Sequence, residues 1–293
     1  MNRMIRHAAL SVLCLFVSAS AAHAQVDARM LQNPDVSKTQ IVFSYAGDLW
    51  VVPKTGGTAL KLSSPAGQEL FPHFSPDGTR IAYTANYDGN YDVYNIASGG
   101  GVPTRVTYHG MTDRILDWYP DGKNLLFASS MASGRQRYNQ FYKVSPDGGL
   151  PEVLPAPPFG EFAAISPDGK MIAYTPQSQA FRTWKRYRGG WAPDIYIFDL
   201  AKNTAENITK NDANDEMPMW AGRKLYFLSD RDQNERANIW VYDLDSKQSK
   251  EVTNFASLAS QVSGKKPGET VKVEIRRGEE TIELDLTIGK RGG

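Results

Sequence analysis

Cysteine is almost missing from this chain, and its scarcity excludes disulfide and thiol chemistry. Cys14 is the only cysteine among the 293 residues, and it falls within residues 1–24, which read as a secretory signal. A lipoprotein signal would need a small residue before its cysteine, and Leu13 is not small. We therefore expect the exported chain to carry no thiol and no disulfide.

The signal itself is predicted from three consecutive features. A basic start at residues 3–7 is followed by an apolar core at residues 8–17 and by the small-x-small cleavage sequence Ala22-His23-Ala24. The apolar core is too short for a membrane span, and its flanks are those of a cleaved signal. The alternative is a buried N-terminal helix. We expect a protein exported to the periplasm or secreted.

Charge of one sign and long apolar runs are also missing. The formal net charge is only +1, so the composition gives no indication of a nucleic-acid partner. After the signal, no segment approaches the roughly 20 apolar residues of a membrane span, so none is expected. Aromatic residues make up 11% of the chain, which suits a packed globular core.

A Pro-Asp-Gly turn is the first feature that recurs. Ser75-Pro76-Asp77-Gly78 returns as Tyr119-Pro120-Asp121-Gly122 and Ser166-Pro167-Asp168-Gly169, at intervals of 44 and 47 residues. Proline pre-sets the first φ of such a turn, aspartate bonds back to the local backbone and glycine accepts a positive φ. A hairpin that recurs with a period above 40 residues indicates a radial β repeat.

An aromatic strand sets the register of the repeat. Five copies begin with a polar residue and occur at spacings of 44, 48, 54 and 44 residues. They are Asp48-Leu49-Trp50-Val51, Asp92-Val93-Tyr94-Asn95, Gln140-Phe141-Tyr142-Lys143, Asp194-Ile195-Tyr196-Ile197 and Asn238-Ile239-Trp240-Val241. Each unit reads as four antiparallel strands, which is a propeller blade. We predict an all-β fold with about five recognisable blades, the first beginning near Gln40.

The repeat stops after Phe255, and the rhythm changes. Residues 256–263 could form a short helix, and residues 271–275 and 282–288 alternate apolar with polar side chains around a turn at residues 277–278. This pattern predicts a helix followed by a β-hairpin. We place a domain junction near residue 255.

Two stretches of sequence carry resemblances to known families. Residues 33–255 resemble the N-terminal TolB-like β-propeller of tricorn protease homologues, and residues 252–290, assigned as a domain from residue 256, resemble the C-terminal half of a PDZ domain. The first resemblance rests on Pro34-Asp35-Val36-Ser37, Gly47-Asp48-Leu49-Trp50-Val51-Val52, the turn that follows Phe74, and the insertion at residues 181–191. The second rests on residues 252–255, on Lys266-Pro267-Gly268 and on the predicted hairpin that follows.

The tricorn resemblance implies a six-bladed propeller at the start of a much longer serine peptidase. A seven-bladed propeller, a PDZ domain and catalytic domains would follow it. Because this chain holds about five blades and half a PDZ domain, we interpret it as an internally deleted relative. The resemblance implies a non-catalytic region that serves substrate access or binds peptides. Alternatives are a periplasmic TolB-like protein-binding scaffold and a fragment without function.

Catalytic and metal-binding patterns are scarce. His73 and His109 are the only histidines after the signal, both are expected at loop ends of blades, and no Gly-x-Ser-x-Gly sequence occurs. The run at residues 211–216 lacks the glycine and terminal glutamate of a calcium loop. We therefore predict no catalytic residue, no metal and no cofactor, and we expect no peptide hydrolysis by this chain alone.

The insertion within the fourth repeat is the predicted binding surface. It interleaves basic and aromatic side chains, and guanidinium groups match the carboxylates of peptides. The candidate peptide-binding residues are Arg182, Trp184, Lys185, Arg186, Arg188 and Trp191. The alternative is a structural loop whose tryptophans pack on a blade or on a neighbouring domain. Expected partners are peptides or proteins, including peptidase subunits.

Overall fold

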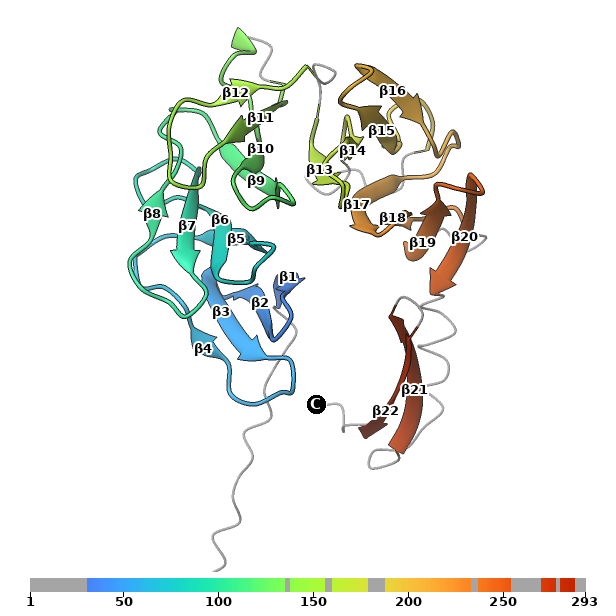
Figure 1. Cartoon of the computed structure of the whole chain (residues 1–293), viewed down its shortest axis with the longest axis horizontal. Helices are drawn as coiled ribbons and strands as arrows, with labels where there is room; N and C mark the ends of the chain where they lie inside the picture. Colours follow the sequence, from blue (N-terminus) through green and yellow to red (C-terminus); the bar gives the residue numbers. More distant parts are fainter. Residues whose placement is uncertain are drawn as a thin grey trace, which may run out of the picture. The chain divides into compact units, whose positions relative to one another are not determined.

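The computed structural model describes residues 31–134, 138–155, 160–178, 188–232, 237–253, 270–277 and 280–287. Five four-stranded antiparallel sheets follow one another along the chain, each with neighbouring strands in sequence order, and a two-stranded hairpin comes after them (Figure 1). The predicted all-β propeller is confirmed. The described blades number five, whereas the family resemblance implies six.

The five blades take their strands from consecutive segments. Blade 1 contains β1 (Gln32–Val36), β2 (Gln40–Tyr45), β3 (Asp48–Pro53) and β4 (Leu60–Lys61). Blade 2 contains β5 (Glu69–Phe74), β6 (Arg80–Ala85), β7 (Asp92–Ala97) and β8 (Thr104–Arg105). Blade 3 contains β9 (Asp113–Trp118), β10 (Leu125–Ser129), β11 (Gln140–Val144) and β12 (Glu152–Val153).

Blades 4 and 5 repeat this order. Blade 4 contains β13 (Phe162–Ile165), β14 (Met171–Thr175), β15 (Tyr196–Asp199) and β16 (Thr204–Asn207). Blade 5 contains β17 (Asp215–Ala221), β18 (Lys224–Ser229), β19 (Asn238–Asp243) and β20 (Gln248–Thr253). The predicted aromatic strands are the third strands, β3, β7, β11, β15 and β19.

Blade 1 starts earlier than predicted. Its first strand is β1, and the segment at Gln40 that the sequence suggested as the start is the second strand, β2. The register between β1 and β2 shifts between Gln32 and Asp35, and Asn33 has a φ of 47°. Because this irregular strand lacks an alternating apolar pattern, it was missed.

The Pro-Asp-Gly turns join the first and second strands of blades 2, 3 and 4, as predicted. In the first copy, the Gly78 amide donates to the Ser75 carbonyl (2.8 Å), and the Thr79 amide donates to Asp77 Oδ1 (3.0 Å). Gly78 has a φ of 74°. The hydrogen bond from the Ser75 hydroxyl is the largest of the effects that lower the pKa of Asp77. The turn is therefore structural.

The core consists of four apolar clusters, one at each boundary between consecutive blades. Neighbouring residues of a second strand join opposite clusters. Ile81 packs towards blade 1, whereas Ala82 packs towards blade 3. Leu125 and Leu126 divide in the same way between blades 2 and 4. The alternation of β side chains thus lets one strand bury both faces.

The predicted C-terminal hairpin is confirmed. β21 (Thr270–Arg277) pairs with β22 (Glu280–Thr287) from Thr270 opposite Thr287 to Arg277 opposite Glu280. The predicted helix at residues 256–263 and the signal at residues 1–24 lie outside the described residues. Within the described part of the chain, no helix is long and apolar enough to cross a bilayer.

Candidate functional site

The innermost strands of the five blades line one cavity. β1 packs on β5, β5 on β9, β9 on β13 and β13 on β17. A cavity of about 550 Å³ lies among them. Its lining comes from residues 33–36, 71–73, 115–118, 162–165, 167 and 217–220. Cavities of this size, mostly apolar with a few polar groups, are the usual form of a ligand site.

One equivalent position from each blade forms what we call the cavity ring: Asp35, His73, Asp117, Ala164 and Met219. The first four each precede the residue that closes the strand pairing next to the first hairpin turn. Met219 is placed by its neighbour, because Trp220 donates to the preceding blade as Trp118 does. The first four are half-buried and Met219 is exposed. The ring is therefore open to the cavity.

Hydrogen bonds near the ring join every pair of consecutive blades. Asp35 Oδ2 accepts from the Phe74 amide (2.6 Å), which links blades 1 and 2. The Trp118 indole donates to the His73 carbonyl (2.9 Å), linking blades 2 and 3.

The remaining two blade boundaries have the same two kinds of hydrogen bond. Asp117 Oδ2 accepts from the Ile165 amide (2.8 Å), linking blades 3 and 4. The Trp220 indole donates to the Ala164 carbonyl (3.1 Å), linking blades 4 and 5. The ring carboxylates therefore have a structural role besides any role towards a ligand.

Three of the innermost strands carry the same irregularity at the cavity. The pairs Asn33-Pro34, Phe71-Pro72 and Met217-Pro218 each lie in a register shift. Their first residues have φ values of 47°, 53° and 56°. Positive φ is strained for side chains as bulky as phenylalanine and methionine. Such strain concentrates at functional sites, and it points to the cavity.

Asp117 is the residue of the cavity ring whose pKa is shifted by its surroundings. Loss of water around its carboxyl raises its pKa to about 6, against the opposing effects of the His73 charge and two backbone donors. Asp117 Oδ1 accepts from the Trp118 amide (2.8 Å), in addition to the bond from Ile165. The carboxylate is therefore fixed in direction by the backbone, within a largely apolar wall.

The predicted peptide-binding insertion is described only at its end. Arg182, Trp184, Lys185 and Arg186 lie outside the described residues. Arg188 donates from Nη2 to the Asp230 carbonyl (2.7 Å). Trp191 is 57% exposed. Of the predicted residues that the structure describes, Arg188 and Trp191, neither is among those that line the cavity.

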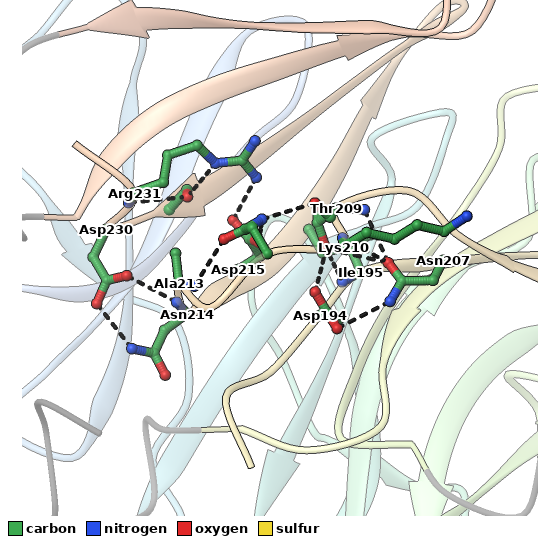
Figure 2. Close-up of polar contacts among 12 residues, drawn as sticks. Asp194, Ile195, Asn207, Thr209, Lys210, Ala213, Asn214, Asp215, Asp230 and Arg231 are labelled. Atoms are coloured by element: carbon green, nitrogen blue, oxygen red, sulfur yellow. Dashed lines mark hydrogen bonds and ion pairs between the residues drawn. The ribbon is translucent and has the colours of Figure 1, made fainter. Parts of the chain in front are cut away.

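The loops that hold this end of the insertion form a polar network (Figure 2). The Asp230 carboxylate accepts from the backbone and side-chain amides of Asn214 (both 2.8 Å). Buried Asp215 accepts from Arg231 (2.7 Å) and from Asn211 (2.8 Å). The run at residues 211–216 is thus tied by hydrogen bonds. No cluster of His, Cys, Asp and Glu suited to a metal occurs among the described residues.

The two histidines occupy different environments. His73 belongs to the cavity ring, on strand β5. His109 Nδ1 accepts from the Met111 amide (3.2 Å), and the His109 carbonyl accepts from Asn90 (2.7 Å), so this residue shapes its own loop. In the part of the chain that the structure describes, neither imidazole is hydrogen-bonded to a serine.

Comparison with known proteins agrees with this architecture. The profile of the tricorn protease N-terminal beta propeller domain matches residues 28–271. The chain belongs to this family.

Similar proteins extend the comparison. Tricorn protease homolog 1 of Streptomyces coelicolor is 29% identical over 88% of this chain, which spans about 25% of that protein. The crystal structure of the tricorn protease superposes with a TM-score of 0.68 at 22% identity, over 90% of this chain and 27% of that one. The crystal structure of TolB from Acinetobacter baumannii superposes with a TM-score of 0.55 at 21% identity, over 75% of this chain and 53% of that one. These structural likenesses show a shared fold.

Sequence reasoning missed the cavity ring of this propeller, although a signal for it existed. Three ring residues, His73, Asp117 and Ala164, stand two residues before the first residue of each Pro-Asp-Gly turn. Comparing that position across repeats would have shown that two of the three are ionisable.

Proposed function

We propose that this chain is the non-catalytic propeller region of an exported tricorn-type serine peptidase and that peptides bind in, or pass through, the cavity between its innermost strands. The cavity of about 550 Å³ carries this proposal. Its wall combines aromatic, thioether and carboxylate side chains, which suits an extended peptide better than a small polar metabolite. The strained bulges at Phe71 and Met217 support a pre-shaped wall.

Binding of short peptides to the purified chain tests this function. We expect saturable binding of dye-labelled hexapeptides by fluorescence anisotropy, without cleavage of the peptides. The variant Ala164→Trp fills the cavity from a ring position and should weaken binding at least tenfold, because the new side chain competes for the same space. The exposed substitution Val102→Trp is the matched control, since Val102 is 91% exposed. Equal binding by both variants would place the peptides elsewhere.

A TolB-like protein-binding scaffold is the second candidate. It is favoured by exposed Trp191, the last residue of the basic insertion, because tryptophan and arginine are enriched at protein interfaces. A pull-down from periplasm separates the two functions. Recovery of peptidase subunits supports the first, whereas recovery of envelope proteins that is lost in Trp191→Ser supports the second.

Export and the PDZ-like C-terminal segment belong to the same proposal. We propose that residues 1–24 are removed on export and that the hairpin β21–β22 is the remnant of a PDZ domain. N-terminal sequencing of the protein from a bacterial periplasm should begin near Gln25. A mature protein that retains residues 1–24 would contradict the export proposal.

A further inference from the structure

The cavity ring is polar on one side and apolar on the other. Asp35, His73 and Asp117 come from blades 1, 2 and 3, whose innermost strands pack in that order. Ala164 and Met219 come from blades 4 and 5. The three ionisable residues therefore form one continuous arc, and the remainder of the ring is uncharged.

Among the described residues, the wall of the cavity carries two carboxylates and no lysine or arginine. Asp35 and Asp117 are these carboxylates, and His73 is the one imidazole among the lining residues that the structure describes. Arg114 lies nearby, over the ring of Phe162 (4.9 Å). Its charge is balanced by an ion pair with Glu161 at 2.8 Å.

Both carboxylates are held in place before any ligand arrives. Asp35 Oδ2 receives the Phe74 amide, and each oxygen of Asp117 receives one backbone amide. A carboxylate oxygen has two lone pairs, so it can accept a further donor while keeping such a bond. Fixed carboxylates attract a cation without the loss of side-chain entropy that weakens an exposed ion pair.

The apolar side of the cavity offers surfaces for hydrophobic side chains. Phe71 and Phe162 meet edge to face with ring centroids 6.4 Å apart. Met217 and Met219 are 37% and 51% exposed. Methionine adapts to differently shaped apolar partners. A peptide that places a cation against the carboxylates would place its neighbouring side chains against this surface.

We infer that the cavity selects cationic peptide segments, with a positively charged nitrogen against Asp35 and Asp117 and apolar side chains against Phe162, Met217 and Met219. This inference rests on the proposed function, because it names the class of peptide that the cavity would take. The nitrogen can belong to a lysine or arginine side chain or to a free N-terminus, since both present donors to a carboxylate.

The test uses four hexapeptides of alanine, leucine and phenylalanine that differ at one central residue and at the N-terminus. Three are N-acetylated and carry lysine, norleucine or glutamate, and the fourth carries norleucine with a free N-terminus. We expect the lysine peptide to bind the full chain about fivefold to tenfold more tightly than the glutamate peptide in fluorescence anisotropy at low salt. Tighter binding of the fourth peptide than of acetylated norleucine would identify the N-terminus as a source of the cation.

Two substitutions assign the preference to the ring. Asp35→Asn removes a charge but keeps an oxygen for the Phe74 amide, so the variant should fold. It should lose about threefold in affinity for the lysine peptide and none for the acetylated norleucine peptide. Met219→Lys adds a cation at an exposed position and should abolish the preference. Asp212→Asn removes the same charge from a residue outside the lining and should change nothing.

The outcomes separate the inference from the function on which it rests. If none of the four peptides binds, the proposed peptide-binding function is wrong, and the inference with it. If all bind with equal affinity, or if Asp35→Asn and Asp212→Asn behave alike, peptide binding stands and the charge preference is wrong. Tighter binding of the glutamate peptide would also overturn the preference.

Discussion

Replacing Asp113 by asparagine should stabilise the propeller at neutral and alkaline pH. Asp113 opens β9, is fully buried, and neither of its carboxylate oxygens accepts a hydrogen bond among the described residues. The Ser129 and Thr107 hydroxyls favour its charged form from nearby, but neither lies in hydrogen-bonding geometry. An ionised carboxylate in such a place destabilises the folded state.

The magnitude follows from the pKa of Asp113. Burial raises this pKa from 3.8 to about 6. At 1.36 kcal/mol per pH unit, the rise corresponds to about 3 kcal/mol. Because the folded state holds the proton more tightly, the contribution of Asp113 is fully favourable below pH 3.8 and is lost as the pH rises through 6. An asparagine side chain cannot ionise, so the Asp113→Asn variant should keep that stability at about pH 8.

The chain contains its own comparison for this site. Glu69 and Asp215 stand at the equivalent starts of β5 and β17, and each receives a side-chain donor, from Tyr87 and from Arg231. Each donor lies two residues after the end of the second strand of its blade, Tyr87 after β6 and Arg231 after β18. Blade 3 has Met131 at that position, and a thioether cannot donate.

Met131→Arg should therefore supply the missing partner. Arg231 lies over the rings of Phe227 (5.2 Å) and Trp240 (4.7 Å). In blade 3, Phe127 and Tyr142 form the equivalent strand pair. We expect the new guanidinium to pack on these rings, to lower the pKa of Asp113, and to raise stability at pH 8 more than at pH 4.

Urea unfolding followed by tryptophan fluorescence at pH 4, 5, 6, 7 and 8 measures both effects. The difference in unfolding free energy between Asp113→Asn and the unaltered protein should grow by about 2–3 kcal/mol from pH 4 to pH 8. Asp212→Asn, in the loop before β17, should show no such growth. A difference that is flat with pH, or that turns against the asparagine variant as the pH rises, would refute the reasoning.

Three further substitutions test the packing of the blades by the same unfolding assay. Gly160→Ala should lower the free energy of unfolding by about 1–3 kcal/mol, because the added Cβ would overlap the ring of Phe141. Gly110→Ala is the control and should leave it unchanged, because the added Cβ meets nothing within 4 Å. Asp117→Ala should lower the free energy of unfolding by about 1–3 kcal/mol, because the Ile165 amide loses its acceptor. A decrease below about 0.5 kcal/mol would mean that water replaces the carboxylate. Gly169→Ala should cost about 1 kcal/mol because Gly169 has a φ of 71°, and an unchanged midpoint would mean that the turn relaxes.

The repeated features of the blades could be predicted from sequence, because each depends on local chemistry. The Pro-Asp-Gly turns and the aromatic third strands were found in this way. β1 could not be predicted in this way, and for the cavity ring the repeat indicates only the shared position of His73, Asp117 and Ala164, not that these residues meet around one cavity. β1 is bent by a bulge at Asn33, so it has no period of two. The ring depends on five strands distant in sequence, and no short window contains more than one of its members.

The most informative positions of this propeller are those where equivalent residues differ. A fold of repeated blades requires the same turn, the same alternation and the same boundary contacts in every unit, so residues that meet these needs vary little in kind. The ring position is freer, because either a carboxylate or a tryptophan of the next blade can join two blades there. Asp35 and Asp117 use the first device, while the boundaries at His73 and Ala164 use the second. Since both devices suffice for packing, the gathering of the two carboxylates and the imidazole on one arc is not required by the fold. It is therefore the feature of the cavity for which a ligand is the best explanation.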